Sequence, residues 1–178
     1  MTMLRRLFGG KRAMATLGTG TSAPQFELPT MDGTRFSLKD ALARGPVLVA
    51  FFKVSCPVCQ YAFPFFERIY KAQGGGKVTI VGISQNEAKD TAQFLGRFGI
   101  TFPALLEDTK AFPVSNAYGL TNVPTSFWIA QNGQIEISSV GWSRGDVEEM
   151  ARKAAEANGG PANPIFQPRE QIADFRPG

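Results

Sequence analysis

The chain has 178 residues, 43% of them hydrophobic and 19% charged, which suits one globular domain with a full apolar core. It contains no histidine, so catalysis and metal binding through imidazole are excluded, and its two cysteines are too few for a disulfide-stapled scaffold. The net charge of +4 matches the four basic side chains of the first 22 residues, which hold no acidic one, so the charge does not indicate a nucleic-acid partner.

Residues 1–22 are rich in Gly, Thr and Arg and show no sustained period, which predicts a flexible basic leader. Their apolar stretches are too short for a signal-peptide core or a membrane span. We therefore expect a cytoplasmic protein without a membrane span, or a periplasmic one if the chain is truncated at its start.

Ordered structure is expected from residue 23. The segments 25–28 and 34–37 are strand-like and flank Asp32-Gly33, where glycine supplies the positive φ that a hairpin turn needs. Ser37 can then cap a short helix over 38–44. This part predicts a two-stranded entry module.

The middle of the chain alternates strands and helices. The run 47–52 is apolar without alternation, which is typical of a strand buried on both faces, and 77–84 has the same pattern. Between them, apolar residues at helical spacing predict a helix that ends near Gln73. A second helix is predicted over 88–98, with one apolar face formed by Ala88, Ala92, Leu95 and Phe98.

The second half predicts a short strand over 102–106 and a short helix over 111–118. Two further strands, 125–130 and 134–141, flank Asn132-Gly133, the strongest short hairpin signal, so they should pair antiparallel.

A closing helix is predicted over 143–157, with Ser143 as its N-cap. The Pro- and Gly-rich segment 158–178 has no periodicity, which predicts a loop-like or disordered tail with Phe166 and Phe175 as candidate docking points. Parallel strand-helix-strand units followed by an antiparallel hairpin predict an α/β fold with a mixed sheet covered on both faces, in one domain over 23–157.

The sequence Cys56-Pro57-Val58-Cys59 lies where the buried strand 47–52 meets the following helix. The first sulfur of such a pair faces the unpaired N–H groups and the positive end of the helix dipole, which favours the thiolate. We therefore predict Cys56 as the nucleophile and Cys59 as the resolving thiol that releases the substrate from a mixed disulfide.

A lone Cys-x-x-Cys pair is also half of a structural zinc site. Tetrahedral zinc needs four N or S ligands, and the chain has no further cysteine and no histidine, so this alternative fails. A pair of inert core cysteines stays open.

Val123-Pro124 directly precedes a predicted core strand. Proline there either simply starts the strand or forms a cis peptide bond, which is energetically cheap only before proline. A cis Pro124 beside the cysteines would leave backbone groups of Val123 free to pair with an extended substrate.

Together these motifs resemble thioredoxin-fold proteins, and more closely the AhpC/TSA-related redoxin branch that includes TlpA- and ResA-like thiol-disulfide oxidoreductases. The likeness spans about 23–157, and the segments that carry it are the Ala23–Leu28 entry module, Cys56–Cys59, Pro64, Tyr118–Thr125, Asn132-Gly133 and Gly141. It implies a three-layer α/β/α fold with an N-terminal β-hairpin extension.

The resemblance also implies dithiol-disulfide exchange at the cysteines, a cis Pro124, and substrate contacts at Pro57, Val58, Val123 and Pro124. The implied partners are disulfide-containing proteins or small thiols and an unidentified electron donor. No cofactor and no metal are expected.

Two positions depart from the family pattern. Thioredoxins carry a buried aspartate six residues before the first cysteine, and ResA-like proteins often a glutamate three residues after the second; this chain has Ala50 and Ala62 there. Lys53 could instead favour the Cys56 thiolate through its positive charge, or be a solvated lysine at a strand end.

The main hypothesis is a thiol-disulfide oxidoreductase that serves cellular redox homeostasis. A peroxiredoxin-like thiol peroxidase is the alternative enzyme, although Val49 and Lys53 occupy the places of the Pro and Thr/Ser that peroxiredoxins need. A non-catalytic redox-sensing or binding module is the third hypothesis. Reduction potentials in this fold range from about −270 to −120 mV, so the sequence does not decide the direction of exchange.

Overall fold

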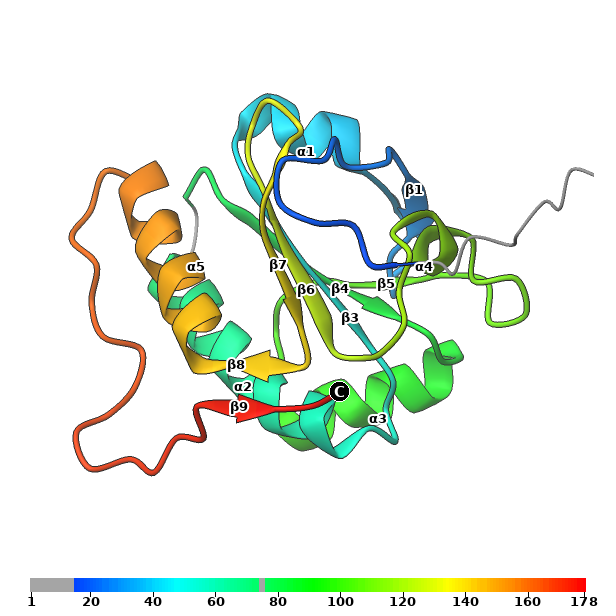
Figure 1. The fold of residues 1–178 in the computed structure, drawn as a ribbon. Coiled ribbons are helices and arrows are strands. Elements are labelled where there is room, and N and C mark those ends of the chain that lie inside the picture. Colours follow the sequence, from blue (N-terminus) through cyan, green and yellow to red (C-terminus); the bar gives the residue numbers. More distant parts are fainter. Residues whose placement is uncertain (1–14, 74–75) are drawn as a thin grey trace, which may run out of the picture.

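A five-stranded sheet lies at the centre of the molecule in this computed structural model, which describes residues 15–73 and 76–178 (Figure 1). The strand order is β5-β4-β3-β6-β7. The first three pair in parallel and β6 pairs antiparallel with β7, as predicted. The antiparallel pair of β3 and β6 joins the two parts of the sheet. The bounds are Val47–Phe52 (β3), Thr79–Ser84 (β4), Ala104–Leu106 (β5), Thr125–Ile129 (β6) and Ile135–Val140 (β7).

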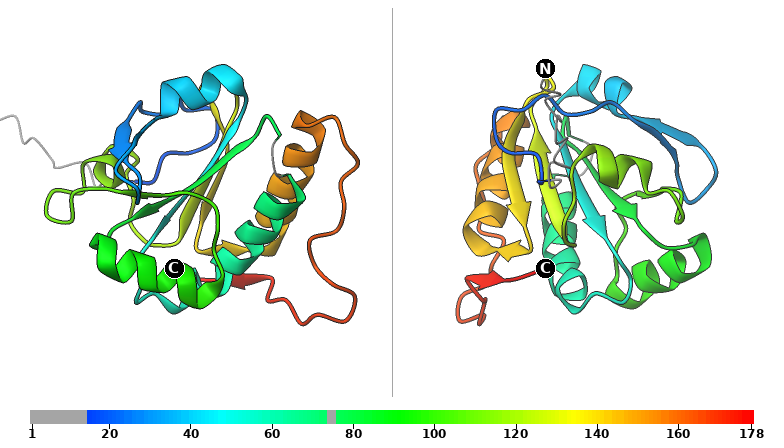
Figure 2. Two further views of the ribbon diagram at one scale, coloured as in Figure 1. Left: turned by 180° about the vertical axis from the view of Figure 1, so that it is seen from behind. Right: turned by 45° about the vertical axis from the view of Figure 1, so that its right-hand side comes forward.

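Every residue of β3 is buried because helices cover both faces of the sheet (Figures 1 and 2). Its alternate side chains, such as Phe52 and Phe51, enter two separate apolar clusters, as the period of two in a strand requires. The cluster around Phe52 includes side chains of α2 (Pro57–Ala72), α3 (Ala88–Phe98) and α5 (Arg144–Ala157). The other includes α1 (Leu38–Arg44) and α4 (Pro113–Ala117). The predicted three-layer α/β/α fold is confirmed.

The predicted entry module is also present. Strands β1 (Glu27–Pro29) and β2 (Arg35–Ser37) pair antiparallel, and Gly33 has a φ of +84° in the turn between them. The Asp40 N–H donates to Ser37 Oγ at 3.3 Å, so Ser37 caps α1 as expected.

The buried face of α3 differs from the prediction. Ala88 and Ala92 are exposed, whereas Thr91 and Phe94 are buried. Phe94 packs on two core rings, Phe52 and Phe63, and buries far more apolar area than an alanine could. The hydroxyl of Thr91 finds a partner in Ser84, at 2.6 Å between the oxygens, so its burial leaves no polar group unsatisfied.

The prediction of a flexible leader over residues 1–22 is wrong at its carboxyl end. Residues 1–14 lie outside the part of the chain that the structure describes. Residues 15–22 run beside β7, where Gly20 N–H donates to the Ile135 carbonyl at 2.8 Å and Ile135 N–H to the Thr21 carbonyl at 2.9 Å. β7 is the last strand of the sheet, so its outer backbone groups would otherwise be unpaired.

The tail over 158–178 is mostly irregular, yet it packs on the domain. Ile165 and Phe166 are buried, so Phe166 docks as predicted, but Phe175 is 60% exposed and does not. The tail ends in β9 (Phe175–Arg176), which pairs antiparallel with β8 (Trp142–Ser143). The sequence showed no strand here because two residues are too few for a periodic pattern.

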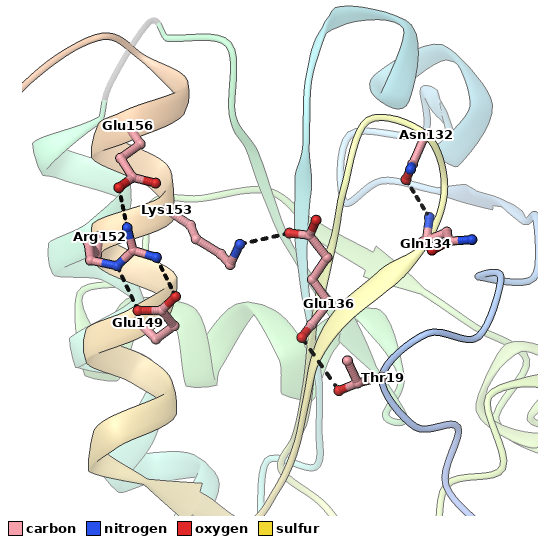
Figure 3. A network of polar contacts seen from close by, with 8 residues as sticks. All are labelled: Thr19, Asn132, Gln134, Glu136, Glu149, Arg152, Lys153 and Glu156. Atoms are coloured by element: carbon pink, nitrogen blue, oxygen red, sulfur yellow. Dashed lines mark hydrogen bonds and ion pairs between the residues drawn. The ribbon is translucent and has the colours of Figure 1, made fainter.

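Surface ion pairs lie along α5 and between α5 and β7 (Figure 3). Arg152 bridges Glu149 and Glu156 along the helix, and Lys153 Nζ lies 2.8 Å from a carboxylate oxygen of Glu136 on β7. Exposed pairs of this kind contribute at most about 1 kcal/mol each. The apolar clusters, rather than these charges, therefore hold α5 on the sheet.

A partly exposed ion pair in the tail should make its docking sensitive to acid. Hydrogen bonds from Arg68 and from the Gln167 N–H lower the pKa of Glu170 from 4.5 to about 2. Because the folded-state pKa is depressed, this stabilisation is complete above about pH 4.5 and is lost as the pH falls toward 2. Glu170→Gln should thus cost less than about 1 kcal/mol at pH 7 and nothing near pH 2. Urea unfolding of both proteins at the two pH values checks this, and an equal cost at both would contradict it.

Candidate active site

Cys56 is the N-cap of α2 and sits directly after the loop that leaves β3. Its backbone is extended, with φ −80° and ψ 115°, so its side chain can turn back over the first turn of the helix. The Cys59 N–H donates to Cys56 Sγ at 3.2 Å. Pro57 follows at the first helical position, where it needs no hydrogen-bond partner for its nitrogen. The half-buried sulfur of Cys56 therefore lies at the positive end of α2.

Cys59 lies one turn further along α2 and is fully buried. Burial raises the pKa of the Cys59 thiol well above its usual range, and the hydrogen bond with Cys56 raises it further. Both cysteines are free thiols in this structure. The two sulfurs therefore differ: one is reachable from solvent, and the other is held neutral behind it.

This difference predicts selective alkylation of the reduced protein. With limiting iodoacetamide at pH 7.5, Cys56 should be modified and Cys59 should react only after unfolding, because its neutral, buried thiol offers almost no thiolate. Peptide mass mapping of the native and the urea-unfolded protein measures both sites. Comparable labelling of the two cysteines in the native protein would contradict the arrangement.

The loop before β6 closes the other side of the site. The Val123–Pro124 peptide bond is cis, and the Cys56 thiol donates to the Val123 carbonyl at 3.3 Å. Val58 and Val123 are partly buried against the cluster that contains Cys59, whereas Pro57 is exposed and Pro124 is buried. The structure thus brings all the predicted substrate-contact residues to the two sides of Cys56.

A cleft of about 470 Å³ opens beside Cys56 on the α4 side. Lys53 lines it with its Nζ 5.9 Å from the centre of the Phe112 ring. Phe112 adopts a left-handed backbone with φ 47°, which is costly for a residue with a Cβ and places its ring in the cleft wall. The other lining residues are mainly polar or aliphatic: Gln85, Ser115, Asn116, Leu120, Thr121, Asn122, Val123 and Gly178.

Sequence reasoning missed a buried polar chain at this edge of the sheet. Glu107 is only 4% exposed and accepts hydrogen bonds from the N–H groups of Val114 and Ser115 and from the Ser115 hydroxyl. Gln85 in the cleft wall donates to Ser115 Oγ at 2.7 Å. The sequence signal that could have revealed this chain is the position of Glu107, an acidic residue directly after a predicted strand and before a predicted short helix. These hydrogen bonds cap α4 and occupy the Glu107 carboxylate. Glu107 therefore does not replace the carboxylates that related proteins carry at the positions of Ala50 and Ala62.

The described residues also bear on metal binding and on the membrane. Within residues 15–73 and 76–178, no three acidic or cysteine side chains gather in a way that could hold a metal ion. In the same ranges, no helix combines the length and apolarity needed to cross a membrane. The expectations of no cofactor and of a cytoplasmic location stay predictions.

The sheet order, the cysteine pair at the start of α2 and the proline loop beside it define a thioredoxin-fold protein with a dithiol site. Residues 19–138 match the family model described as the AhpC/TSA family, and the chain belongs to this family.

Relatives and solved structures agree with this assignment. Thiol-disulfide oxidoreductase ResA from Geobacillus thermodenitrificans is 31% identical over 136 residues, which cover 76% of this chain and 75% of that protein. ResA from Bacillus subtilis is 30% identical over 135 residues, which cover 75% of this chain and 72% of that protein. A thiol:disulfide interchange protein from Chlorobium tepidum has a TM-score of 0.64 and 28% identity over 79% of this chain and 98% of its own.

The peroxidoxin BcpB from Mycobacterium tuberculosis has the same TM-score of 0.64 but 23% identity, covering 78% of this chain and 96% of its own, so it shows the shared fold alone. The resemblance seen in the sequence motifs is confirmed.

Proposed function

We propose that this thiol-disulfide oxidoreductase exchanges disulfides with its substrates through the Cys56–Cys59 pair, and that reduction of a substrate disulfide proceeds in two steps. In the first step the Cys56 thiolate attacks one substrate sulfur, the substrate S–S bond breaks, and the other substrate sulfur leaves as a thiolate. The sulfur of Cys59 then attacks Cys56 and forms the Cys56–Cys59 disulfide, while the bond from Cys56 to the substrate breaks and the Cys59 proton passes to the departing substrate sulfur, which leaves as a thiol. Two electrons pass to the substrate, and a separate thiol donor must restore the dithiol.

The observation that carries this proposal is the asymmetry of the pair. Cys56 Sγ accepts the Cys59 N–H at the amino end of α2 and is half-buried, whereas Cys59 is fully buried one turn behind it. The attacking and the resolving roles need this difference in access.

The remaining site residues take supporting roles in this proposal. Val123 and Pro124 form one side of the substrate site, and Pro57 and Val58 the other. Lys53 supplies a positive charge among the described residues that line the cleft beside Cys56.

Equilibration against glutathione tests the proposal and decides the direction. The protein is incubated in mixtures of reduced and oxidised glutathione, and its free thiols are trapped and counted by mass. We expect one two-electron transition between dithiol and Cys56–Cys59 disulfide, whose midpoint gives the reduction potential. A protein that stays fully reduced in oxidised glutathione, with no mixed disulfide, would refute thiol-disulfide exchange.

The peroxidase alternative has less support in the site. Val49 is fully buried within β3, and Lys53 stands where a peroxiredoxin has its hydroxyl residue, so neither supplies the group that would activate a peroxide. Consumption of hydrogen peroxide with dithiothreitol as donor distinguishes the two activities. A rate that depends on Cys56 and exceeds the rate of disulfide reduction would favour the peroxidase.

A further inference from the structure

We propose that residues 173–178 form a wall of the active site and restrict its substrates to small disulfides, an inference that rests on the proposed thiol-disulfide exchange. This segment carries β9 and follows the loop that packs over α2 and α5 (Figure 1). It ends beside Cys56, since Gly178 lines the same cleft.

The segment is anchored on two elements next to the site. From the β8 side, Trp142 Nε1 donates to the Ala173 carbonyl at 2.6 Å, and Arg144 N–H donates to the Asp174 carbonyl at 2.9 Å. From α2, the hydroxyl of Tyr61 accepts the Ala173 N–H at 3.1 Å, and the Arg176 guanidinium lies 3.8 Å from the centre of the Tyr61 ring. Tyr61 follows Cys59 by two residues, so the anchor belongs to the same helix as the cysteines.

Beyond the anchor, the backbone lies against the proline loop. Asn122 Nδ2 donates to the Gly178 carbonyl at 3.0 Å, and a Cβ added at Gly178 would lie 2.7 Å from the Val123 carbonyl oxygen. A Cβ added at Gly141 would collide with the Arg176 carbonyl, so this glycine with φ +79° lets the segment approach the end of β7. The backbone of 176–178 therefore occupies the space between Gly141 and Val123.

This placement determines which substrates can reach Cys56. A polypeptide bound as an extended strand needs several residues of backbone along the edge beside Val123, which the segment covers. The cleft on the α4 side stays open, and its volume of about 470 Å³ lies in the range of small-molecule sites. A small disulfide can therefore enter where a protein strand cannot.

The experiment compares variants of the whole chain that weaken the anchor while leaving the cysteines and the proline loop in place. Glu170→Gln/Arg176→Ala removes the tail ion pair and the contact with Tyr61, and Ala173→Pro/Arg176→Ala removes that contact and the N–H donor to Tyr61. Arg35→Ala is the matched control, because its exposed ion pair with Glu27 lies on the entry hairpin. Initial rates are measured with insulin and with 2-hydroxyethyl disulfide.

We expect the ratio of insulin rate to small-disulfide rate to rise at least about tenfold in one or both anchor variants, and to stay unchanged in Arg35→Ala. The small-disulfide rate itself should not fall by more than about twofold, because release of the wall opens the cleft and leaves both cysteines in place. An unchanged ratio in both anchor variants would overturn the inference while leaving the proposed function intact. Absence of Cys56-dependent turnover with either substrate in the unmodified protein would instead refute the proposed function.

Discussion

Replacing Cys56 with serine is expected to reduce disulfide reduction to the background of the assay. A serine hydroxyl in the same place is not an anion near neutral pH, so it cannot displace a thiolate from a substrate disulfide. The buried thiol of Cys59 cannot take over the attack, because it is fully enclosed and burial keeps it protonated. Turnover of 2-hydroxyethyl disulfide measures the loss.

Two variants complete the experiment. Cys59→Ser keeps the first step and removes the second, so it should accumulate a mixed disulfide on Cys56 that is visible as an added mass of one substrate half. Ser55→Ala, next to the nucleophile and exposed, should keep full activity. Residual turnover in Cys56→Ser would assign the nucleophile elsewhere and refute the proposed order of steps.

Phe63→Ala should cause the largest loss of stability. The ring of Phe63 on α2 is fully buried and packs on Phe52, Phe94 and Phe102, with centroids 4.4, 5.5 and 5.6 Å away. Removing such a ring costs the transfer energy of its atoms and leaves a cavity, together about 3–5 kcal/mol. Urea denaturation measures the change, and thermal unfolding should show a drop of roughly 2–4 °C for each kcal/mol.

Phe175→Ala is the matched control, because it deletes the same ring from a site that is 60% exposed, and it should cost less than about 0.5 kcal/mol. Phe63→Leu should fall between the two and stays measurable if Phe63→Ala does not fold. Equal losses for Phe63→Ala and Phe175→Ala would show that this ring cluster does not stabilise the fold.

Much of the fold could be predicted because local signals and burial agreed. The run Val47–Phe52 is apolar throughout, and the structure buries it on both faces. Ser37 and Ser143 each precede a helix and accept the expected N–H three residues on. Asn132-Gly133 lies between two paired strands, with φ +85° at the glycine. These are properties of short segments, so the neighbouring residues are enough to specify them.

The errors occurred where partners far apart in the sequence decide the outcome. The buried face of α3 depends on Phe52, Phe63 and Ser84, and no period within 88–98 reveals them. Residues 15–22 are polar and irregular, yet they hydrogen-bond to the outer edge of β7. Gly82 in β4 leaves room for three phenylalanine rings, because an added Cβ would lie 3.2–3.4 Å from them.

The sequence by itself determined where thiol chemistry could occur: the chain has no histidine, and its two cysteines form one Cys-x-x-Cys pair at a strand-to-helix junction. Only the tertiary structure decided how that centre is enclosed. It placed the Val123 carbonyl 3.3 Å from the Cys56 sulfur across 67 residues, and Gly178 beside both. The reason is physical. The N–H groups at the start of a helix reach a sulfur in the same short segment, as the Cys59 N–H reaches Cys56 Sγ. The walls of a site form only when distant segments pack together to bury their apolar surface.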